Sequence, residues 1–177
     1  EEMVKSELPG VSLVEKPVNR GFAVANNQGI RMARGRAVLL LNSDTELADN
    51  ALPVLHRFLF SREEIGVVGG RLVYASGAPQ WSYGFAPSLG RMLWITISGL
   101  LRITWGRKPG AIIPEGVGRP MPVEYIVGAD LMAKKSVLDR VGGMDESLFA
   151  YSEETDLCTR IRQAGFEGLE IAQAPAY

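Results

Sequence analysis

Short apolar runs alternate with helix-like segments along most of this chain. Strands are expected at residues 11–14, 37–41, 66–73 and 123–127, and helices at 22–33, 50–60, 136–141 and 153–164. Residues 37–41 read Ala-Val-Leu-Leu-Leu, and such an uninterrupted apolar run is typical of a strand buried on both faces of a sheet. Strands that alternate with helices predict an α/β layered domain with a largely parallel sheet. At 177 residues, the chain is expected to be a single domain over residues 1–177.

The middle of the chain, residues 75–122, is rich in glycine and proline and predicts no regular element. It holds all three tryptophans and one stretch without a charge, residues 92–101. A membrane-spanning helix needs about 20 such residues, so this stretch is too short to span. It is expected to be buried, to contact a second copy of the chain in a homo-oligomer or, with Trp94 and Trp105 nearby, to lie peripherally at a membrane surface.

The composition narrows the class of protein. A net charge of -1 argues against nucleic acid as a partner, because binding to phosphates normally shows as a basic excess. The single Cys158 and the single His56 exclude an internal disulfide and a Cys-based or multi-His metal site. His56 is expected to be a surface or packing residue of a helix. The charged first residues lack the apolar stretch of a signal peptide, so a cytoplasmic location is expected, with the inner face of the membrane as an alternative.

A polar cluster, Asn42-Ser43-Asp44, directly follows the apolar run at residues 37–41. In parallel α/β sheets, ligands bind outside the carboxyl ends of the strands, so this place favours a site. A carboxylate there can hold Mg²⁺ or Mn²⁺ together with the phosphates of a nucleotide, since these cations need only one or two protein carboxylates. The alternative is a plain turn, because the same residue types are common in turns.

A second cluster puts three acids into one helical turn, Glu153, Glu154 and Asp156, with Arg160 one turn further along. One interpretation is structural: Ser152 caps the helix and the acids complement the helix dipole. The other is catalytic, with one carboxylate as the general base for an acceptor hydroxyl. Glu153, Asp156 and Arg160 are spaced to interact with one another, which leaves Glu154 on a different face.

Three further segments carry weaker signals. Residues 19–22, Asn-Arg-Gly-Phe, open a predicted helix whose free N–H groups could meet an anion, although glycine there also fits a plain loop. Residues 128–130, Gly-Ala-Asp, follow a predicted strand at the same sheet edge. Residues 142–146, Gly-Gly-Met-Asp-Glu, could simply end a helix.

Taken together and in order, these segments resemble the family 2 glycosyltransferases of the rhamnosyltransferase-like type. The matching segments are residues 19–30 (NRGFAVANNQGI), 39–45 (LLLNSDT), 128–129 (GA), 142–146 (GGMDE) and 151–160 (YSEETDLCTR). The resemblance implies the GT-A fold, a nucleoside-diphosphate sugar as donor (dTDP-rhamnose or a UDP-sugar), a divalent metal (Mg²⁺ or Mn²⁺) and inversion at the anomeric carbon. The acceptor would be a hydroxyl of a saccharide or of a lipid-linked acceptor in polysaccharide or cell-envelope glycan synthesis.

The resemblance also implies roles for residues. Asp44 matches the metal-reaching acid of a DxD-type motif in which Asn42 replaces the first acid, and Glu153-Glu154 matches an acidic pair whose second member, usually Asp, is the base. The catalytic candidates are therefore Glu154 and Glu153. Donor and cofactor binding are assigned to Asn19, Gly21, Phe22, Asn26, Asn42, Asp44 and Arg160, metal binding to Asp44, and other substrate contacts to Gly128, Ala129, Asp130, Asp145 and Glu146.

Two family features are not visible, an opening strand with a base-binding acidic motif and a late histidine, so the chain is expected to be truncated at both ends. Two other functions stay open. A nucleotidyltransferase of related fold would show a Gly-rich phosphate loop with Lys or Arg near its start, and none is seen. A binding module without turnover could keep the same fold.

Overall fold

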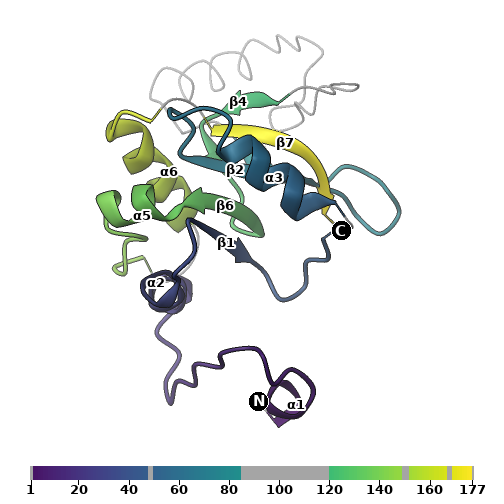
Figure 1. The fold of residues 1–177 in the computed structure, drawn as a ribbon, viewed down its shortest axis with the longest axis vertical. Coiled ribbons are helices and arrows are strands. Elements are labelled where there is room, and N and C mark those ends of the chain that lie inside the picture. The colour runs from purple at the N-terminus through teal and green to yellow at the C-terminus, as the bar shows by residue number, and fades with distance from the viewer. Residues whose placement is uncertain (1, 48–49, 85–119, 149–151, 167–168, 177) are drawn as a thin grey trace, which may run out of the picture.

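The computed structural model describes residues 2–47, 50–84, 120–148, 152–166 and 169–176. Its helices are α1 (Glu2–Glu7), α2 (Phe22–Met32), α3 (Ala51–Leu59), α5 (Lys135–Val141) and α6 (Glu153–Gln163). Its strands are β1 (Ala37–Leu41), β2 (Val67–Leu72), β3 (Tyr83–Gly84), β4 (Met121–Val123), β5 (Tyr125–Ile126), β6 (Asp130–Lys134) and β7 (Leu169–Ala176) (Figure 1).

Five of these strands form one sheet, in the order β1-β6-β2-β7-β4. The α/β class is confirmed, but the expectation of a largely parallel sheet is wrong for the described strands. Only β2 and β7 pair in parallel, whereas the β1–β6, β2–β6 and β4–β7 ladders are antiparallel. The difference arises because β6 lies between β1 and β2 and β4 lies at the edge beside β7, and each of them runs against its neighbours.

Although β6 lies between them, β1 and β2 run in the same direction, because both are antiparallel to β6. β7 is parallel to β2 and shares that direction. The carboxyl ends of β1, β2 and β7 therefore point toward one edge of the sheet (Figure 1). We call this edge the carboxyl edge.

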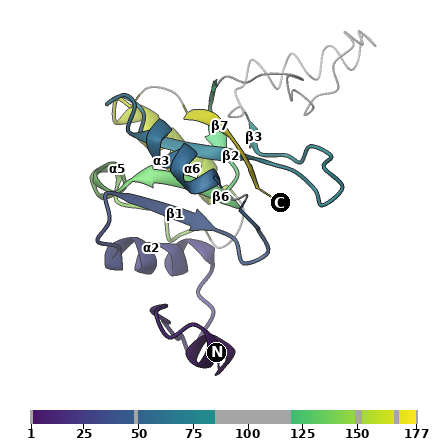
Figure 2. The same cartoon turned by 45° about the vertical axis from the view of Figure 1, so that its right-hand side comes forward.

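The two faces of the sheet bury different helices. On one face, α3 packs through Leu55 and Leu59 against Val68 and Met132. On the other face, the core combines residues of α2, α5 and α6 with Val38, Leu40, Val67, Leu131 and Ala133 of the strands. Figure 2 shows α2 running along β1. β1 is thus covered on both faces, as its apolar sequence predicted, although only Val38 and Leu40 are buried, Ala37 and Leu39 are partly buried and Leu41 is 42% exposed.

Several predicted elements differ from the structure. Residues 11–14 are exposed and form no strand, since no described strand lies beside them to complete a ladder. The strand predicted at residues 123–127 is divided between β4 and β5, and α1, β6 and β7 were not predicted. The four predicted helices all exist, with ends within two residues of those expected.

A buried asparagine joins α2 to the loop after α5. The Asn27 side chain accepts a hydrogen bond from Met144 N at 2.8 Å and donates to Met144 O at 2.8 Å and to Glu146 Oε1 at 3.0 Å. Gly143 has a positive φ of 74°, and a Cβ there would collide with Asn27 Oδ1. The Gly142-Gly143 pair is therefore needed both to end α5 and to let this loop approach Asn27.

We expect Asn27→Ala to lower the free energy of unfolding by about 2–4 kcal/mol, because the buried Met144 amide and carbonyl both lose their partner. Asn26→Ala is the matched control, since Asn26 only donates to Phe22 O within its own helix. Urea unfolding of both variants measures the difference. Equal losses in the two variants would show that the Asn27 contacts do not hold this loop.

Candidate functional site

The turn after β1 lies against the start of β6. Asn42 N donates to Ala129 O at 3.1 Å, and Thr45 N donates back to Asn42 O at 3.1 Å, which closes the turn. Within this turn Asn42 is half-buried, whereas Asp44 is exposed. The structure thus brings together two segments predicted from sequence, residues 42–44 and residues 128–130, at the carboxyl edge.

The first residue of α2 reaches the same place. Gly128 is buried, and a Cβ added to it would lie 3.6 Å from the Phe22 ring. Just before the helix, Gly21 has a φ of 92° and donates its N–H to Asn19 Oδ1 at 2.9 Å. A cavity of about 390 Å³ adjoins this helix start and is lined by Ser12, Val14, Lys16, Val18, Asn19, Arg20, Gly21, Ala25, Gln28 and Gly29. Asn19 and Gly21 therefore line a cavity beside the start of α2, and Phe22, the first residue of the helix, lies near Gly128; the donor binding assigned to these residues stays a prediction.

Asp130 opens β6 and is buried, with 1% of its surface exposed. Its Oδ2 atom accepts a hydrogen bond from Gly70 N at 3.0 Å, while Oδ1 has no hydrogen-bond partner within the described ranges. Burial raises the pKa of this carboxyl from its usual 3.8 to about 6, and the Gly70 hydrogen bond opposes the rise. Asp130 therefore joins β6 to β2 beneath the site, which differs from the open substrate contact expected for it.

We predict that ionisation of Asp130 destabilises the fold. A carboxyl with a raised pKa in the folded state contributes stability that is present below its unfolded pKa and is lost as the pH rises through about 6. A shift of about two pKa units corresponds to roughly 3 kcal/mol. Asp130→Asn keeps an oxygen for Gly70 N and cannot ionise, so unfolding free energies measured from pH 4 to pH 7 should fall less steeply in the variant. Parallel pH profiles for the two proteins would contradict this account.

The acids of α6 are in three different environments. Asp156 is paired with Arg160, whose Nε donates to Asp156 Oδ2 at 2.8 Å and whose Nη1 donates to Val141 O at 2.7 Å. Glu153 is 4% exposed, and its Oε2 atom has no partner in the part of the chain that the structure describes. Glu154 is half-buried, and its pKa is raised by burial and further by the charge of Glu153.

These environments revise the structural interpretation of the acidic cluster. Ser152 precedes α6 with a φ of 75° and makes no capping hydrogen bond through its side chain. Asp156 pairs with Arg160 as its spacing predicted, but Glu153 is buried instead of joining that pair. The Arg160 guanidinium joins α6 to the end of α5. The contact with the nucleotide-sugar donor that was predicted for Arg160 would therefore need the N–H groups that do not bond to Asp156 or Val141.

The direction of α6 brings its first turn to the carboxyl edge. Near the end of α6, Ile161 lies over the start of β2, where a Cβ on Gly66 would be 2.9 Å from Ile161 Cγ2. Cys158, earlier in the helix, packs beside Ile126, which in turn covers Gly69 further along β2. The helix therefore runs antiparallel to β2. Glu153 begins the helix about 7.5 Å before Cys158, toward the end of β2 and Asp130.

The remaining candidate residues form hydrogen bonds with other side chains or with the backbone. Asn26 donates to Phe22 O within α2. Asp145 accepts from Ser147 N at 2.9 Å, and Glu146 accepts from Asn27 and Arg31. These hydrogen bonds lower the pKa of both exposed acids. Sequence reasoning missed Asn27, although a second asparagine inside a helix, next to Asn26, was a signal that a buried partner is required.

Comparison of the sequence with known protein families decides the family of this chain. The protein-family model described as Glycosyl transferase family 2 matches residues 1–112, which is more than half of the chain. This chain belongs to glycosyl transferase family 2. The resemblance drawn from its motifs is confirmed by a match that does not depend on the assignment of any single residue.

Two curated relatives of this family 2 chain have assigned activities. The low-salt glycan biosynthesis hexosyltransferase Agl10 of Haloferax volcanii is 26% identical over 167 residues, which cover 92% of this chain and 49% of that protein. The N-acetylglucosaminyl-diphospho-decaprenol L-rhamnosyltransferase of Mycobacterium tuberculosis is 26% identical over 180 residues, which cover 94% of this chain and 58% of that protein. The chain spans about half the length of these relatives.

Two solved structures share the fold. GalNAc-T7 with UDP, GalNAc and Mn²⁺ superposes with a TM-score of 0.68 at 14% identity, covering 99% of this chain and 35% of that one. The mannosyltransferase PcManGT from Pyrobaculum calidifontis, in complex with GDP-Man and Mn²⁺, gives a TM-score of 0.58 at 18% identity, covering 98% of this chain and 40% of that one. At these identities the likeness concerns the fold, and it confirms the GT-A expectation.

Three other predictions, on membrane and oligomer contact, on the metal and on His56, can be compared with the structure. No helix within the described ranges is long and apolar enough to cross a membrane. Residues 92–101, with Trp94 and Trp105, lie outside the described residues, so membrane contact and homo-oligomer formation stay predictions.

Among the residues that can be described, no group of three or more His, Cys, Asp or Glu side chains could hold a metal. His56 is exposed and packs against Phe60, with 4.8 Å between the ring centroids.

Proposed function

We propose that this chain forms part of an inverting glycosyltransferase. In the proposed reaction, a sugar moves from a nucleoside-diphosphate donor, dTDP-rhamnose or a UDP-sugar, to a hydroxyl of a saccharide or lipid-linked acceptor in polysaccharide or cell-envelope glycan synthesis. The observation that carries the proposal is the arrangement of acids at the carboxyl edge: Asp44 follows β1, Asp130 opens β6, and Glu153-Glu154 begin α6. Family membership favours sugar transfer over nucleotidyl transfer, and acids gathered at one edge favour turnover over binding alone.

Asp44 is proposed to bind the cation that holds the diphosphate of the sugar donor. It is exposed, it follows the end of a buried strand, and Asn42 beside it offers an amide oxygen without charge. One carboxylate suits Mg²⁺ or Mn²⁺ when phosphate oxygens and water supply the remaining ligands. Such a cation, when bound, neutralises the charge that develops on the departing diphosphate. Both solved structures named above contain Mn²⁺ together with UDP or GDP-Man, which supports this proposal.

Asp44→Asn in the full-length protein is expected to weaken UDP or dTDP binding at least about tenfold in the presence of Mn²⁺, because the cation loses the carboxylate proposed to hold it. Titration calorimetry measures this affinity with Mn²⁺ and again with EDTA, where the variant and the wild type should bind alike. Glu46→Gln, which removes an exposed acid two residues away, is the matched control. Nucleotide affinity that does not respond to EDTA would contradict the role of Asp44.

Glu154 is proposed as the general base. A base must touch the acceptor hydroxyl and have a pKa near the working pH, and Glu154 is half-buried with a raised pKa. Glu153 is almost fully buried, and its charge adds to the rise in the pKa of Glu154 that burial of Glu154 causes first. In the proposed displacement, the Glu154 carboxylate takes the hydroxyl proton. The acceptor oxygen bonds to the anomeric carbon on one face as the bond to the diphosphate breaks on the other, through an oxocarbenium-like state.

We predict that Glu154→Gln lowers kcat by about 10²-fold or more with donor binding little changed, because it keeps the shape and removes the proton acceptor. Wild-type kcat should fall as the pH drops through the raised pKa of Glu154, since the base must be ionised. In Glu153→Gln, the pKa of Glu154 loses its like-charge contribution, so this acid limb should move to lower pH. Near-normal kcat in Glu154→Gln together with a large loss in Glu153→Gln would make Glu153 the base.

A further inference from the structure

A hydrogen-bonded hairpin follows β2 beyond the carboxyl edge. Gln80 N donates to Leu72 O at 2.9 Å, and Tyr74 N donates to Ala78 O at 2.8 Å. The hairpin turns at Gly77, whose φ of 79° suits glycine and whose N–H donates to Tyr74 O at 2.7 Å. These bonds hold residues 72–80 in one defined register.

A serine hydroxyl fixes the base of this hairpin. Ser82 is buried, and its Oγ accepts from Leu72 N at 2.8 Å and donates to Gln80 O at 3.0 Å. The Ser82 hydroxyl thus takes the place of a backbone carbonyl as the acceptor for Leu72 N, at the point where the returning strand leaves β2. The residue between Gln80 and Ser82 is therefore held by hydrogen bonds on both sides.

That residue is Trp81, and 51% of its surface is exposed. The bridge between Val73 and Pro79 and the bond from Gln80 N to Leu72 O place Trp81, the next residue, near Arg71 of β2. Tyr74, 54% exposed, lies opposite Ala78 and therefore on the other face of the hairpin. The hairpin thus presents one exposed aromatic residue on each face.

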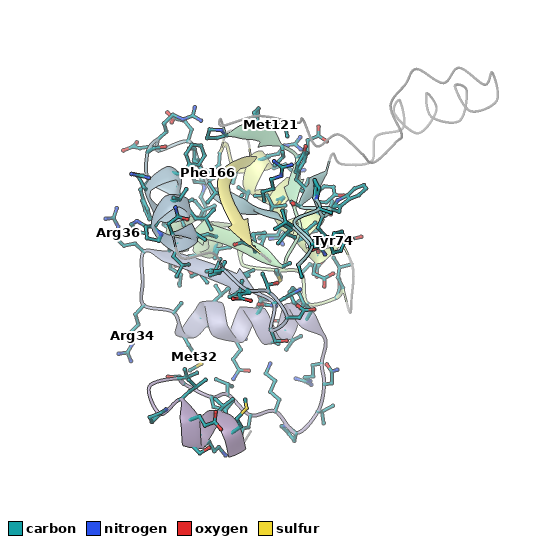
Figure 3. The ribbon with its side chains drawn as sticks, turned by 90° about the vertical axis from the view of Figure 1, so that its right-hand side faces the viewer. Met32, Arg34, Arg36, Tyr74, Met121 and Phe166 are labelled. Atoms are coloured by element: carbon teal, nitrogen blue, oxygen red, sulfur yellow. The ribbon has the colours of Figure 1, made fainter. Side chains whose placement is uncertain are left out.

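The Trp81 face adjoins the candidate site. Arg71 directly follows Gly70, whose N–H donates to Asp130, so Trp81 lies just beyond the part of the edge that holds Asp130. Tyr83 supports this placement: burial raises its pKa, and the nearby Arg71 charge opposes the rise. Arg34 and Arg36 precede β1 and therefore lie at the end of the sheet opposite the carboxyl edge. Figure 3 shows Tyr74 of the same hairpin on the side away from these two residues, which is the side of the carboxyl edge.

We propose that Trp81 is a stacking residue for the acceptor saccharide, with the Arg71 guanidinium beside it as a donor to sugar hydroxyls. One face of a pyranose ring presents several C–H groups, which are weakly positive and suit the negative face of an indole. A guanidinium supplies several N–H donors in a fixed geometry. Arg71 Nε is itself buried and has no hydrogen-bond partner among the described residues, so the donors proposed for the sugar are those of the two outer nitrogens. This inference rests on the proposed function, because it assigns the acceptor side of the same edge.

The chemistry of the hairpin favours a sugar over a protein or a membrane. The tip residues Ser76, Gly77 and Ala78 are small or polar, and the aromatic residues point to opposite faces. A protein partner or a lipid surface is normally held by a cluster of apolar anchors on one face. A single exposed indole with an arginine on the neighbouring strand matches the size and the polarity of one sugar ring.

Saturation-transfer NMR tests this with the full-length protein, UDP and Mn²⁺. The probes are the methyl glycosides of rhamnose, glucose, galactose and N-acetylglucosamine. For at least one of them we expect transfer to be concentrated on the C–H protons of one ring face. The dissociation constant of that glycoside should rise at least about tenfold in Trp81→Ala and less in Trp81→Phe, which keeps a ring. Tyr74→Ala is the matched control and should bind as the wild type does.

Two results would overturn the proposal: unchanged glycoside binding in Trp81→Ala, or no saturation transfer from the wild-type protein to any of the four glycosides. Nucleotide affinity and thermal unfolding of each variant, measured in parallel, show whether the protein is folded. They also separate this inference from the proposed function. Loss of the stacking role alone would leave metal-dependent nucleotide binding intact, whereas failure of the proposed function would remove that binding from the wild type itself.

Discussion

The pairing of β6 between β1 and β2 is the constraint on which the candidate site depends. The ladder sets Leu41 opposite Asp130, and the turn that follows β1 is then held by Asn42 N donating to Ala129 O. On its other side, β6 brings Asp130 to Gly70 N at the end of β2. A shift of β6 by one residue would reverse the faces of its side chains and separate these contacts.

Buried acids give the carboxyl edge its chemistry and reduce its stability. Asp130 and Glu153 are both almost inaccessible, and each has one carboxylate oxygen without a partner in the described structure. Such groups are costly to bury when ionised. Burial raises the pKa of Asp130, and the pKa of Glu154 is raised first by its own burial and then by the charge of the adjacent Glu153. The environment that raises the pKa of Glu154, the proposed base, therefore comes at a cost in free energy of folding.

Local patterns predicted the helices and the strongest strands, because amphipathic spacing and an apolar run act over a few neighbouring residues. α2, α3, α5 and α6 were predicted to within two residues of their ends, and β1 was predicted with its bounds. Residues 130–134, Asp-Leu-Met-Ala-Lys, were not predicted as a strand, since their pairing with β1 involves residues about 90 positions away. The mixed direction of the sheet follows from that pairing and has no local signature in the sequence.

The sequence by itself determined the family and the residue types available for chemistry. Asn42-Ser43-Asp44 after an apolar strand and Glu153-Glu154 at a helix start are recognisable without coordinates. Only the tertiary structure decided their environments: Glu153 is buried while Glu154 is half-buried, Asp130 bonds to β2, and Arg160 is tied to α5. The physical reason is that a side chain's identity is set by its position in the sequence. Its burial, charge state and partners depend on segments that meet only in the folded chain.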